Sequence, residues 1–456
     1  PEGMEKRVAA IKDGGVLAQE LDRLFTGVTR TERPDFDFEQ RSGAREVMES
    51  MAVMNLEGFG IPIDHSALGP AGALLIYAQD VLKGKPGNLQ RIEEYRTGDS
   101  LLLDPATQRN LEVFKTSAQT RKGSLLDAMD QTVTSAGARL LESYLSSPER
   151  NLAEIHRRQR CVVEFSQAPS AVEEVASILK TGSDLERILG RLRNRLVRPR
   201  ELGGLRSTIR GLPKVSHCML GLGERFPAIF QLAQRVQTFE ELCAVLDRAL
   251  EEELPAEIKV DVKGEGGRVI RAGYDTQFDE LRELGSGGKR WILELEAAER
   301  ENTGINNLKV KYNGAFGYFI EVTKANLHLV PEHYIRKQTM TNAERYYTDE
   351  LRRKEKEIVN AEERAVAKEQ ELFLSVVELA LEQADALAQT ARVLAEIDLF
   401  SSWGAIMRDR DYCMPEFVED SRELEISQGR HPVVETVLKQ ESLGLAGTHA
   451  FVPNDC

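Results

Sequence analysis

The sequence has few cysteines, few aromatic side chains and no long apolar run. An odd number of cysteines cannot all pair, and none stands in a C-x-x-C spacing: they are Cys161, Cys218, Cys243, Cys413 and Cys456. This excludes a disulfide framework and a thiolate zinc site, and it favours reduced, cytoplasmic thiols. No stretch of about 18 apolar residues exists, so the sequence predicts no membrane span. The first residues also lack the apolar segment of a signal peptide.

Histidines and catalytic motifs are scarce too. His328 and His333 are five residues apart, a spacing that suits neither one helix face nor one strand face. Surface histidines in a turn are therefore favoured over a metal site. The nearest match to a G-x-x-x-x-G-K-[ST] phosphate loop is GSGGKR at 285–290, where Glu283 and Arg290 replace the required glycine and hydroxyl residue. We interpret this segment as a flexible joint in a helix. We expect no catalytic residue and no ATP hydrolysis from this chain.

What is present indicates a large, charged, mainly helical chain. Its 456 residues exceed what one hydrophobic core usually serves, so two to four domains are expected. Hydrophobic residues make up 41% and charged residues 29%, which is typical of a soluble helical protein. The chain begins at Pro1 and stops at Cys456 after a strand-like approach. We read both ends as cut, and expect a piece of a longer protein.

Helical periodicity dominates the middle of the chain. Apolar residues recur every three or four positions from about 124 to 250, and Asp104-Pro105 opens a further helix. Two long charged helices are predicted at about 276–302 and 342–383, the second free of proline and glycine. A coiled coil is the alternative for the second helix, but apolar heptads do not persist. Other expected elements are helices at 15–25, 42–56 and 67–83, a linker at 84–88, and strands at 100–103 and 266–275.

Between the two long helices lies a short basic stretch with a different pattern. From Lys309 to Arg345 it has six lysines and arginines against three glutamates, a local charge of +3 in a chain of net charge −14. Apolar residues alternate with lysines in 308–312, Asn313-Gly314 predicts a turn, and 318–322 alternates again. The pattern predicts a two-stranded ribbon with Lys309 and Lys311 on one face, packed by Tyr312, Phe316, Tyr318 and Tyr334.

The residues after this ribbon extend the basic surface. We place RKQTMTN at the start of the returning helix, where hydroxyls, amides and free backbone N–H groups are common phosphate ligands. A solvated basic loop is the alternative. The predicted DNA-backbone contacts are Lys309, Lys311, Asn313, Lys324, Arg336, Lys337, Thr339, Thr341 and Asn342.

Several long strings resemble, in order, the MutS family of bacterial DNA mismatch repair proteins. They include GDSLLLDPATQRNLEV, SLLDAMDQTVTSAGARLL, ERENTGINNLKVKYNGAFGYFIEVTK and RKQTMTNAERY. The resemblance implies a mainly α, multi-domain fold with long lever helices, a small β-rich clamp insertion and a partial α/β connector. It implies a connector at 1–89, core and lever helices at 90–296, a clamp at 297–356, returning lever helices at 357–412 and the start of an ATPase domain at 413–456. The family's mismatch-reading Phe-x-Glu domain and its Walker A loop do not occur in these residues.

Near the C-terminus, GRHPVVE (429–435) and AFVPND (450–455) resemble the family's approach to its nucleotide site. The resemblance implies that Phe451 lies against the adenine of ATP or ADP, with Pro453 and Asn454 in the same loop, and that Mg²⁺ accompanies the nucleotide. A core phenylalanine is the alternative. Arg430-His431-Pro432 is interpreted as structural, because proline holds an extended turn before a helix at Val433.

The function implied by the resemblance is DNA mismatch repair in a bacterial cytoplasm, close to the nucleoid. A homodimer would bind mismatched double-stranded DNA, switch with ATP to a sliding clamp and recruit MutL. Two alternatives remain. One is a MutS paralogue acting on recombination intermediates, disfavoured because residues 1–89 resemble a connector. The other is a helical scaffold whose tip binds protein, which would need an exposed apolar patch there.

Overall fold

The computed structural model describes residues 31, 33–51, 53–56, 61–83, 92, 100–259, 267–313, 317–418, 423–442 and 451–456, without the side chains of 286, 289 and 439–442. The predicted helix at 15–25, the linker at 84–88, and Gly314 and Phe316 of the ribbon turn lie outside these residues. Contacts divide the chain into two compact units: Pro1–Leu102 with Ser147–Asn151, and Leu103–Ser146 with Leu152–Cys456. The domain borders expected from the sequence stay predictions.

The described part of the first unit contains η1 (Asp35–Phe38), α2 (Gln40–Met51) and α3 (Leu68–Leu82). The last two correspond to the helices expected at 42–56 and 67–83. They pack around a small apolar cluster of Ala44, Val47, Leu56, Ile61 and Leu68. The strand expected at 100–103 is reduced to one antiparallel bridge between Ser100 and Glu149. Too few residues pair there to form a ladder.

The second unit is built around helices, as the periodicity of 124–250 predicted. In chain order they are α4 (Pro105–Asn110), α5 (Leu125–Met129), α6 (Ser135–Ser146), α7 (Leu152–Ser166), α8 (Pro169–Thr181), α9 (Leu185–Arg193), α10 (Pro199–Leu220), η3 (Gly223–Arg225), α11 (Pro227–Gln234) and α12 (Glu240–Ala249). Proline opens α4, α8, α10 and α11, where its missing N–H leaves no helical bond unmade. The mainly α class is confirmed.

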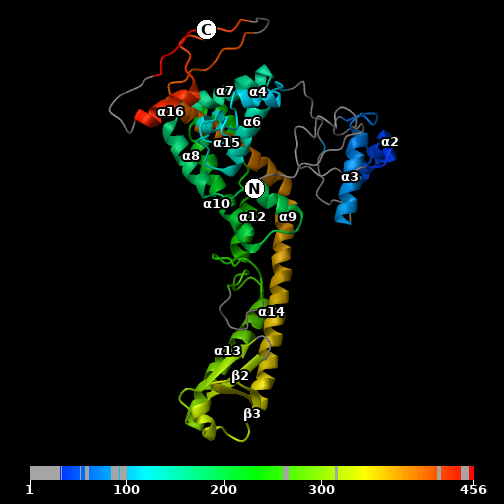
Figure 1. Ribbon diagram of the computed structural model, residues 1–456, viewed down its shortest axis with the longest axis vertical. Coiled ribbons are helices and arrows are strands. Elements are labelled where there is room, and N and C mark those ends of the chain that lie inside the picture. Colours follow the sequence, from blue (N-terminus) through cyan, green and yellow to red (C-terminus); the bar gives the residue numbers. More distant parts are fainter. Residues whose placement is uncertain are drawn as a thin grey trace. The chain divides into compact units, whose positions relative to one another are not determined.

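Helix α15 (Ala384–Asp409) lies at the centre of this helical body (Figure 1). It packs against α6, α7, α8 and α9, so apolar residues occupy nearly its whole circumference. Its buried Asp398 accepts hydrogen bonds from the backbone N–H groups of Val133 (3.0 Å) and Thr134 (2.8 Å). Burial raises the pKa of Asp398. These bonds fix the start of α6 against the central helix.

Two long helices, α13 (Thr276–Thr303) and α14 (Asp349–Glu382), connect the helical body with a small sheet (Figure 1). The prediction for α13 is confirmed, but the predicted start of the returning helix at Asn342 is wrong by seven residues. Residues 343–347 form a strand instead, because their alternating side chains pair with neighbouring strands. The side chain of Thr348 accepts the N–H of Leu351 and caps α14. The helix then rises about 51 Å over its 34 residues.

The glycine-rich segment 285–290 is not a joint, contrary to the interpretation from the sequence. α13 runs through it unbroken. A Cβ atom at Gly288 would lie 2.3 Å from Cγ1 of Ile358, and one at Gly285 would lie 2.7 Å from Oε1 of Glu362. The glycines therefore permit α13 to approach α14 closely. This contact lies along the two helices between the core of the helical body and the core of the sheet.

Gly288→Ala is expected to destabilise the chain by about 1–3 kcal/mol, because the added methyl overpacks the contact with Ile358. Gly287→Ala is the matched control: its Cβ meets no atom within 4 Å, and alanine favours a helix by up to about 1 kcal/mol. Denaturant unfolding of both variants measures the difference. Equal stabilities would contradict the close approach at Gly288.

The strand expected at 266–275 is a single bridge between Leu250 and Ile270. Two backbone hydrogen bonds flank this bridge, from Arg271 N–H to the Ala249 carbonyl and from Glu251 N–H to the Val269 carbonyl. The N–H groups of Val269 and Ile270 donate to the buried carboxylate of Glu369 on α14, so a side chain takes the place of a second strand partner.

The small sheet has four antiparallel strands in the order β1-β2-β4-β3, where two were predicted. The strands are β1 (Lys309–Asn313), β2 (Gly317–Thr323), β3 (Ile335–Thr339) and β4 (Ala343–Tyr347), with η4 (Lys324–Leu329) after β2. Two strands are marginal in water, and the second hairpin together with α13 and α14 supplies the missing burial. Within the described residues, no helix combines the length and apolar character needed to cross a bilayer.

Candidate nucleic-acid interface

The two faces of the sheet differ sharply. The inner face buries Tyr318, Ile320, Val322 and Tyr346 against Leu351 and Ile358 of α14 and Ile292 of α13. The predicted packing role of the tyrosines agrees with this: the rings of Tyr312 and Tyr318 lie 5.0 Å apart, and Tyr334 lies 5.9 Å from Tyr346. The inner face therefore fixes the sheet to the long helices.

The outer face carries alternate residues of the strands, which we call the cationic face: Lys309, Lys311, Phe319, Glu321 and Arg345. Their common side follows from the register, in which Lys309 opposes Glu321, Lys311 opposes Phe319, and Glu321 opposes Arg345. The predicted placement of both lysines on one strand face is consistent with this pairing. Three cations and one anion share the surface.

Charges on the cationic face are unequally engaged. Nζ of Lys311 lies 2.7 Å from Oε1 of Glu321, and Nε of Arg345 lies 3.5 Å from Oε2 of the same carboxylate. The hydrogen bond from Lys311 lowers the pKa of Glu321, so this carboxylate is ionised at neutral pH. Lys309 is exposed and pairs with no side chain among the described residues. It is the cation most available to an incoming phosphate.

Sequence reasoning counted Arg345 in the basic stretch but omitted it from the predicted contacts. Its guanidinium lies over the ring of Phe319, 4.3 Å from the centroid, and donates to Gln338 (2.9 Å). The sequence contained a signal for this role: if 343–347 is a strand with Tyr346 facing inward, its neighbour Arg345 must face outward. Reading 343–347 as a helix hid it.

The remaining predicted contacts lie on the second hairpin rather than at a helix N-terminus. Arg336 is exposed and lies 3.8 Å from Glu344. Lys337 is exposed and lies over the ring of Tyr347 at 5.6 Å, and Thr339, Thr341 and Asn342 are exposed around the β3–β4 turn. In this turn the N–H of Met340 donates to the carbonyl of Ala343. Free helical N–H groups are thus not part of this surface, since the helix begins at Asp349.

Lys324 and Asn313 lie at the ends of β2 and β1. Lys324 is exposed, and its backbone N–H donates to the carbonyl of Asn342 at 3.2 Å, which holds the β2 end beside the β3–β4 turn. Asn313 is exposed at the last position of β1. All nine predicted contacts therefore belong to the same four-stranded sheet or its connections.

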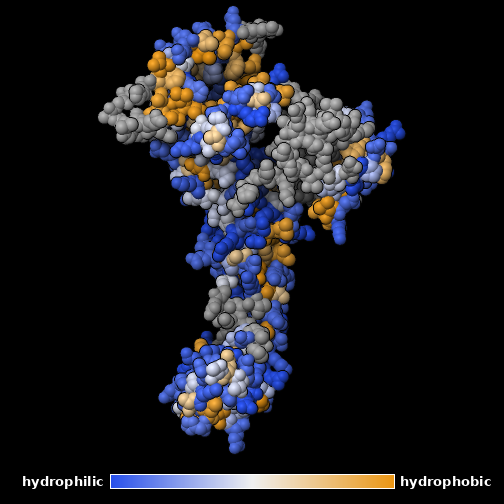
Figure 2. All heavy atoms as spheres, in the orientation of Figure 1, coloured by the Kyte–Doolittle hydropathy of each residue, from blue (hydrophilic) through white to orange (hydrophobic). Residues whose placement is uncertain are grey.

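A few apolar side chains interrupt the polar surface of the sheet region, which is mostly hydrophilic in Figure 2. Leu329, Ile335 and Met340 are 42%, 42% and 40% exposed. They belong to η4, β3 and the β3–β4 turn, and Ile335 opposes Tyr347 on the same side of the sheet as Arg345. Such partial exposure of single side chains is common on protein surfaces.

The C-terminal residues form a second candidate site. The segment around Gly429 pairs with Asn454 in both directions, at 2.7 and 3.1 Å, and Ile426 pairs likewise with Cys456. Phe451 is half-buried, while Pro453 and Asn454 are exposed. The nucleotide-binding role that the resemblance implies for these residues stays a prediction.

The interpretation of Arg430-His431-Pro432 as structural is confirmed. Arg430 donates to the carbonyls of Arg410 and Asp411 and to Glu435, tying this segment to the end of α15. Pro432 is the first residue of α16 (Pro432–Ser442).

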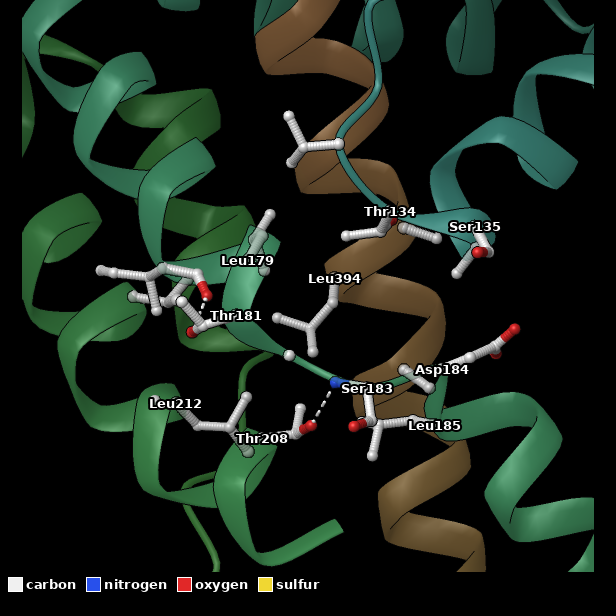
Figure 3. A pocket seen from close by; sticks show the side chains of 18 of the residues that line it. Thr134, Ser135, Leu179, Thr181, Ser183, Asp184, Leu185, Thr208, Leu212 and Leu394 are labelled. Carbon is white, nitrogen blue, oxygen red and sulfur yellow. Dashed lines mark hydrogen bonds between the residues drawn. The ribbon is translucent and has the colours of Figure 1, made fainter. Parts of the chain in front are cut away.

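The helical body contains a cavity of about 140 Å³ bordered by α8, α9, α10 and α15 (Figure 3). Its wall includes Leu179, Leu212 and Leu394, and a hydrogen bond from the Ser183 N–H to Thr208. Ligand pockets usually enclose about 300–1,000 Å³, and this one is smaller. The part of the chain that the structure describes has no cluster of metal-ligating side chains.

Fold and site define a helical protein in which a pair of long helices carries a small cationic β-sheet. A family model described as MutS domain III matches residues 106–404. Proteins named DNA mismatch repair protein MutS are 38% identical over 455 residues in an Anaeromyxobacter species, 38% over 457 in Myxococcus xanthus and 36% over 419 in Symbiobacterium thermophilum. These matches cover 99%, 99% and 92% of this chain but 49%, 49% and 46% of the relatives.

The chain therefore belongs to the MutS family. It spans about half the length of the curated relatives it matches.

Proposed function

We propose that this chain serves DNA mismatch repair by holding the sugar–phosphate backbone of double-stranded DNA on its small sheet. The observation that carries the proposal is the cationic face, where the exposed and unpaired Lys309 stands beside Lys311 and Arg345. Strand spacing places such cations where they can follow a phosphate backbone. The inner face has fixed the sheet to two long helices, so a bound duplex is held by a stiff support.

Non-specific backbone contact suits a clamp rather than a sequence reader. Lysine and arginine neutralise phosphates without contacting base edges, and their effect is the same for any sequence. The hairpin residues Lys337, Thr341 and Asn342 extend this surface beyond the cationic face, as do Asn313 and Lys324 at the strand ends. Arg336 and Thr339 oppose Tyr346 and Glu344 across the β3–β4 ladder, so the register places them on the other side of the sheet. Recognition of a mismatch then belongs to other parts of the protein.

The test is equilibrium binding of a fluorescent matched duplex to this chain over a range of salt concentrations. Each neutralised phosphate contributes about −0.9 to the slope of log K against log salt. We expect the cationic face to give a slope of about −2 or steeper. Binding that does not respond to salt would reject a phosphate-holding role and would favour the protein-binding scaffold, for which the partly exposed Leu329, Ile335 and Met340 are the available contacts.

For the whole protein we propose a homodimer that encloses the duplex, changes state with ATP or ADP and Mg²⁺, and recruits MutL. The relatives are named for mismatch repair, and the match to this chain supports the same process here. In this scheme Phe451 stacks on the nucleotide base, with Pro453 and Asn454 in the same loop. No membrane association is part of the proposal.

Phe451→Ala in the whole protein is expected to weaken nucleotide binding about five- to hundredfold, because a base stacked on an aromatic ring gains roughly 1–3 kcal/mol. Phe417→Ala is the matched control, since this partly exposed ring lies against His156 instead. Titration with a fluorescent nucleotide gives both dissociation constants. If Phe451→Ala binds as tightly as Phe417→Ala, Phe451 does not belong to the site.

A further inference from the structure

Glu321 occupies the middle of the cationic face. Its carboxylate is engaged on both oxygens, by Lys311 at 2.7 Å and by Arg345 at 3.5 Å, while Lys309 is its direct partner across the β1–β2 ladder. The side chain of Glu321 is 22% exposed. An anion with two oxygens thus already lies among the cations that a phosphate would approach.

Lys311 and Arg345 have the charges of a phosphate-binding site, and the carboxylate of Glu321 occupies the place of the phosphate. The guanidinium of Arg345 is held in place by stacking on Phe319 and by its bond to Gln338. Its Nε is buried without a hydrogen-bond partner among the described residues, 3.5 Å from the nearest carboxylate oxygen of Glu321. Lys311 and Arg345 are therefore the cations for which Glu321 and an incoming phosphate would compete.

We propose that Glu321 is an internal competitor for the DNA phosphate and thereby limits how tightly the sheet holds any duplex. The proposal rests on the backbone-holding function proposed for this face. A phosphate that binds Lys311 and Arg345 must displace the carboxylate or accept its repulsion. The cost falls equally on every sequence, so Glu321 sets the strength of non-specific binding.

Weaker non-specific binding would let a clamp move more easily along the duplex. Phosphate contacts supply most of non-specific affinity, and strong ones slow movement along the duplex. With Glu321 in place, one cation, Lys309, is open and two are shared. Removal of the negative charge would turn all three cations to the DNA.

Glu321→Gln tests the proposal, because glutamine keeps the size and polarity of the side chain without its charge. We expect binding of this chain to a fluorescent matched duplex to become about three- to tenfold tighter at 0.1 M salt, and the salt slope to steepen by up to about one unit. In a Lys311→Ala background the gain should be smaller, because one of the two competed cations is then absent. Glu332→Gln is the matched charge control, an exposed glutamate in the loop before β3.

The outcomes separate the two proposals. If Lys309→Ala weakens binding while Glu321→Gln equals Glu332→Gln, the backbone-holding function stands and the role of Glu321 is rejected. If Lys309→Ala leaves affinity and salt slope unchanged, the backbone-holding function fails. A tighter, more salt-dependent Glu321→Gln with an unchanged melting temperature supports the internal competitor, since a merely structural role would not change the salt slope.

Discussion

Glu369→Ala is expected to destabilise the second unit by about 3–5 kcal/mol, the usual cost of removing one partner from a buried charged network. Glu369 is 2% exposed, and its Oε1 accepts the N–H groups of Val269 (2.7 Å) and Ile270 (3.2 Å). Arg268 lies 3.8 Å from its other oxygen. Alanine would leave two buried donors without an acceptor and would weaken the attachment of the entry to α13 to α14, to which the ion pair of Arg268 with Glu362 at 3.0 Å also contributes.

The control for this variant is Glu371→Ala, two residues further along α14. Glu371 is exposed and pairs only within its own helix, with Lys368 at 2.9 Å, so its loss should change stability little. Glu369→Gln retains an acceptor oxygen and should fall between the two. Denaturant unfolding followed by circular dichroism measures all three. A Glu369→Ala midpoint equal to that of Glu371→Ala would show that the backbone donors find other acceptors.

The Lys309→Ala, Lys311→Ala double variant is expected to bind matched duplex about eight- to sixtyfold more weakly at 0.1 M salt. Each lost phosphate contact removes about 0.9 unit of salt slope, which is about eightfold in affinity at this concentration. Lys309 should contribute a full contact, and Lys311 less, because Glu321 already engages its ammonium group at 2.7 Å. The slope should flatten by about one to two units. In the whole protein, the ratio of mismatched to matched affinity should stay constant, since phosphate contacts do not read sequence.

Two controls distinguish charge from packing in this experiment. Lys368→Ala removes a lysine from α14 near the helical body and should leave the slope unchanged. Val310→Ala removes apolar volume from the inner face and should lower stability without altering the slope. The salt titration by fluorescence anisotropy reads both. An unaltered slope in the double variant would mean that the cationic face is only solvated.

Local sequence rules predicted the elements whose stability is local. Pro105 after Asp104 opened a helix, and the side chain of Asp104 accepts the N–H groups of Ala106 and Thr107. The alternation of Lys309 and Lys311 with apolar residues predicted their common side, because strand geometry alternates side chains whatever the strand pairs with.

The errors arose where a distant partner overrides local preference. Residues 343–347 lead directly into a long helical pattern and were therefore predicted to be part of that helix. They pair instead with β2 and β3, because the hydrogen bonds of a strand ladder outweigh a weak local preference for helix. Glycines at 285–288 suggested a joint because glycine weakens isolated helices. The contacts of Gly288 with Ile358 and of Gly285 with Glu362, 70 and 77 positions away, give these glycines a packing role instead.

The sequence by itself determined the helical class, the family and the basic character of residues 309–345, because composition, periodicity and order of motifs are properties of the chain. Only the tertiary structure decided which cations are open. Glu321 lies ten residues from Lys311 and 24 from Arg345, and strand register brings all three together. Net charge counts them alike, whereas the electrostatic interaction of each depends on distances of a few ångström, which the register of the folded sheet alone sets.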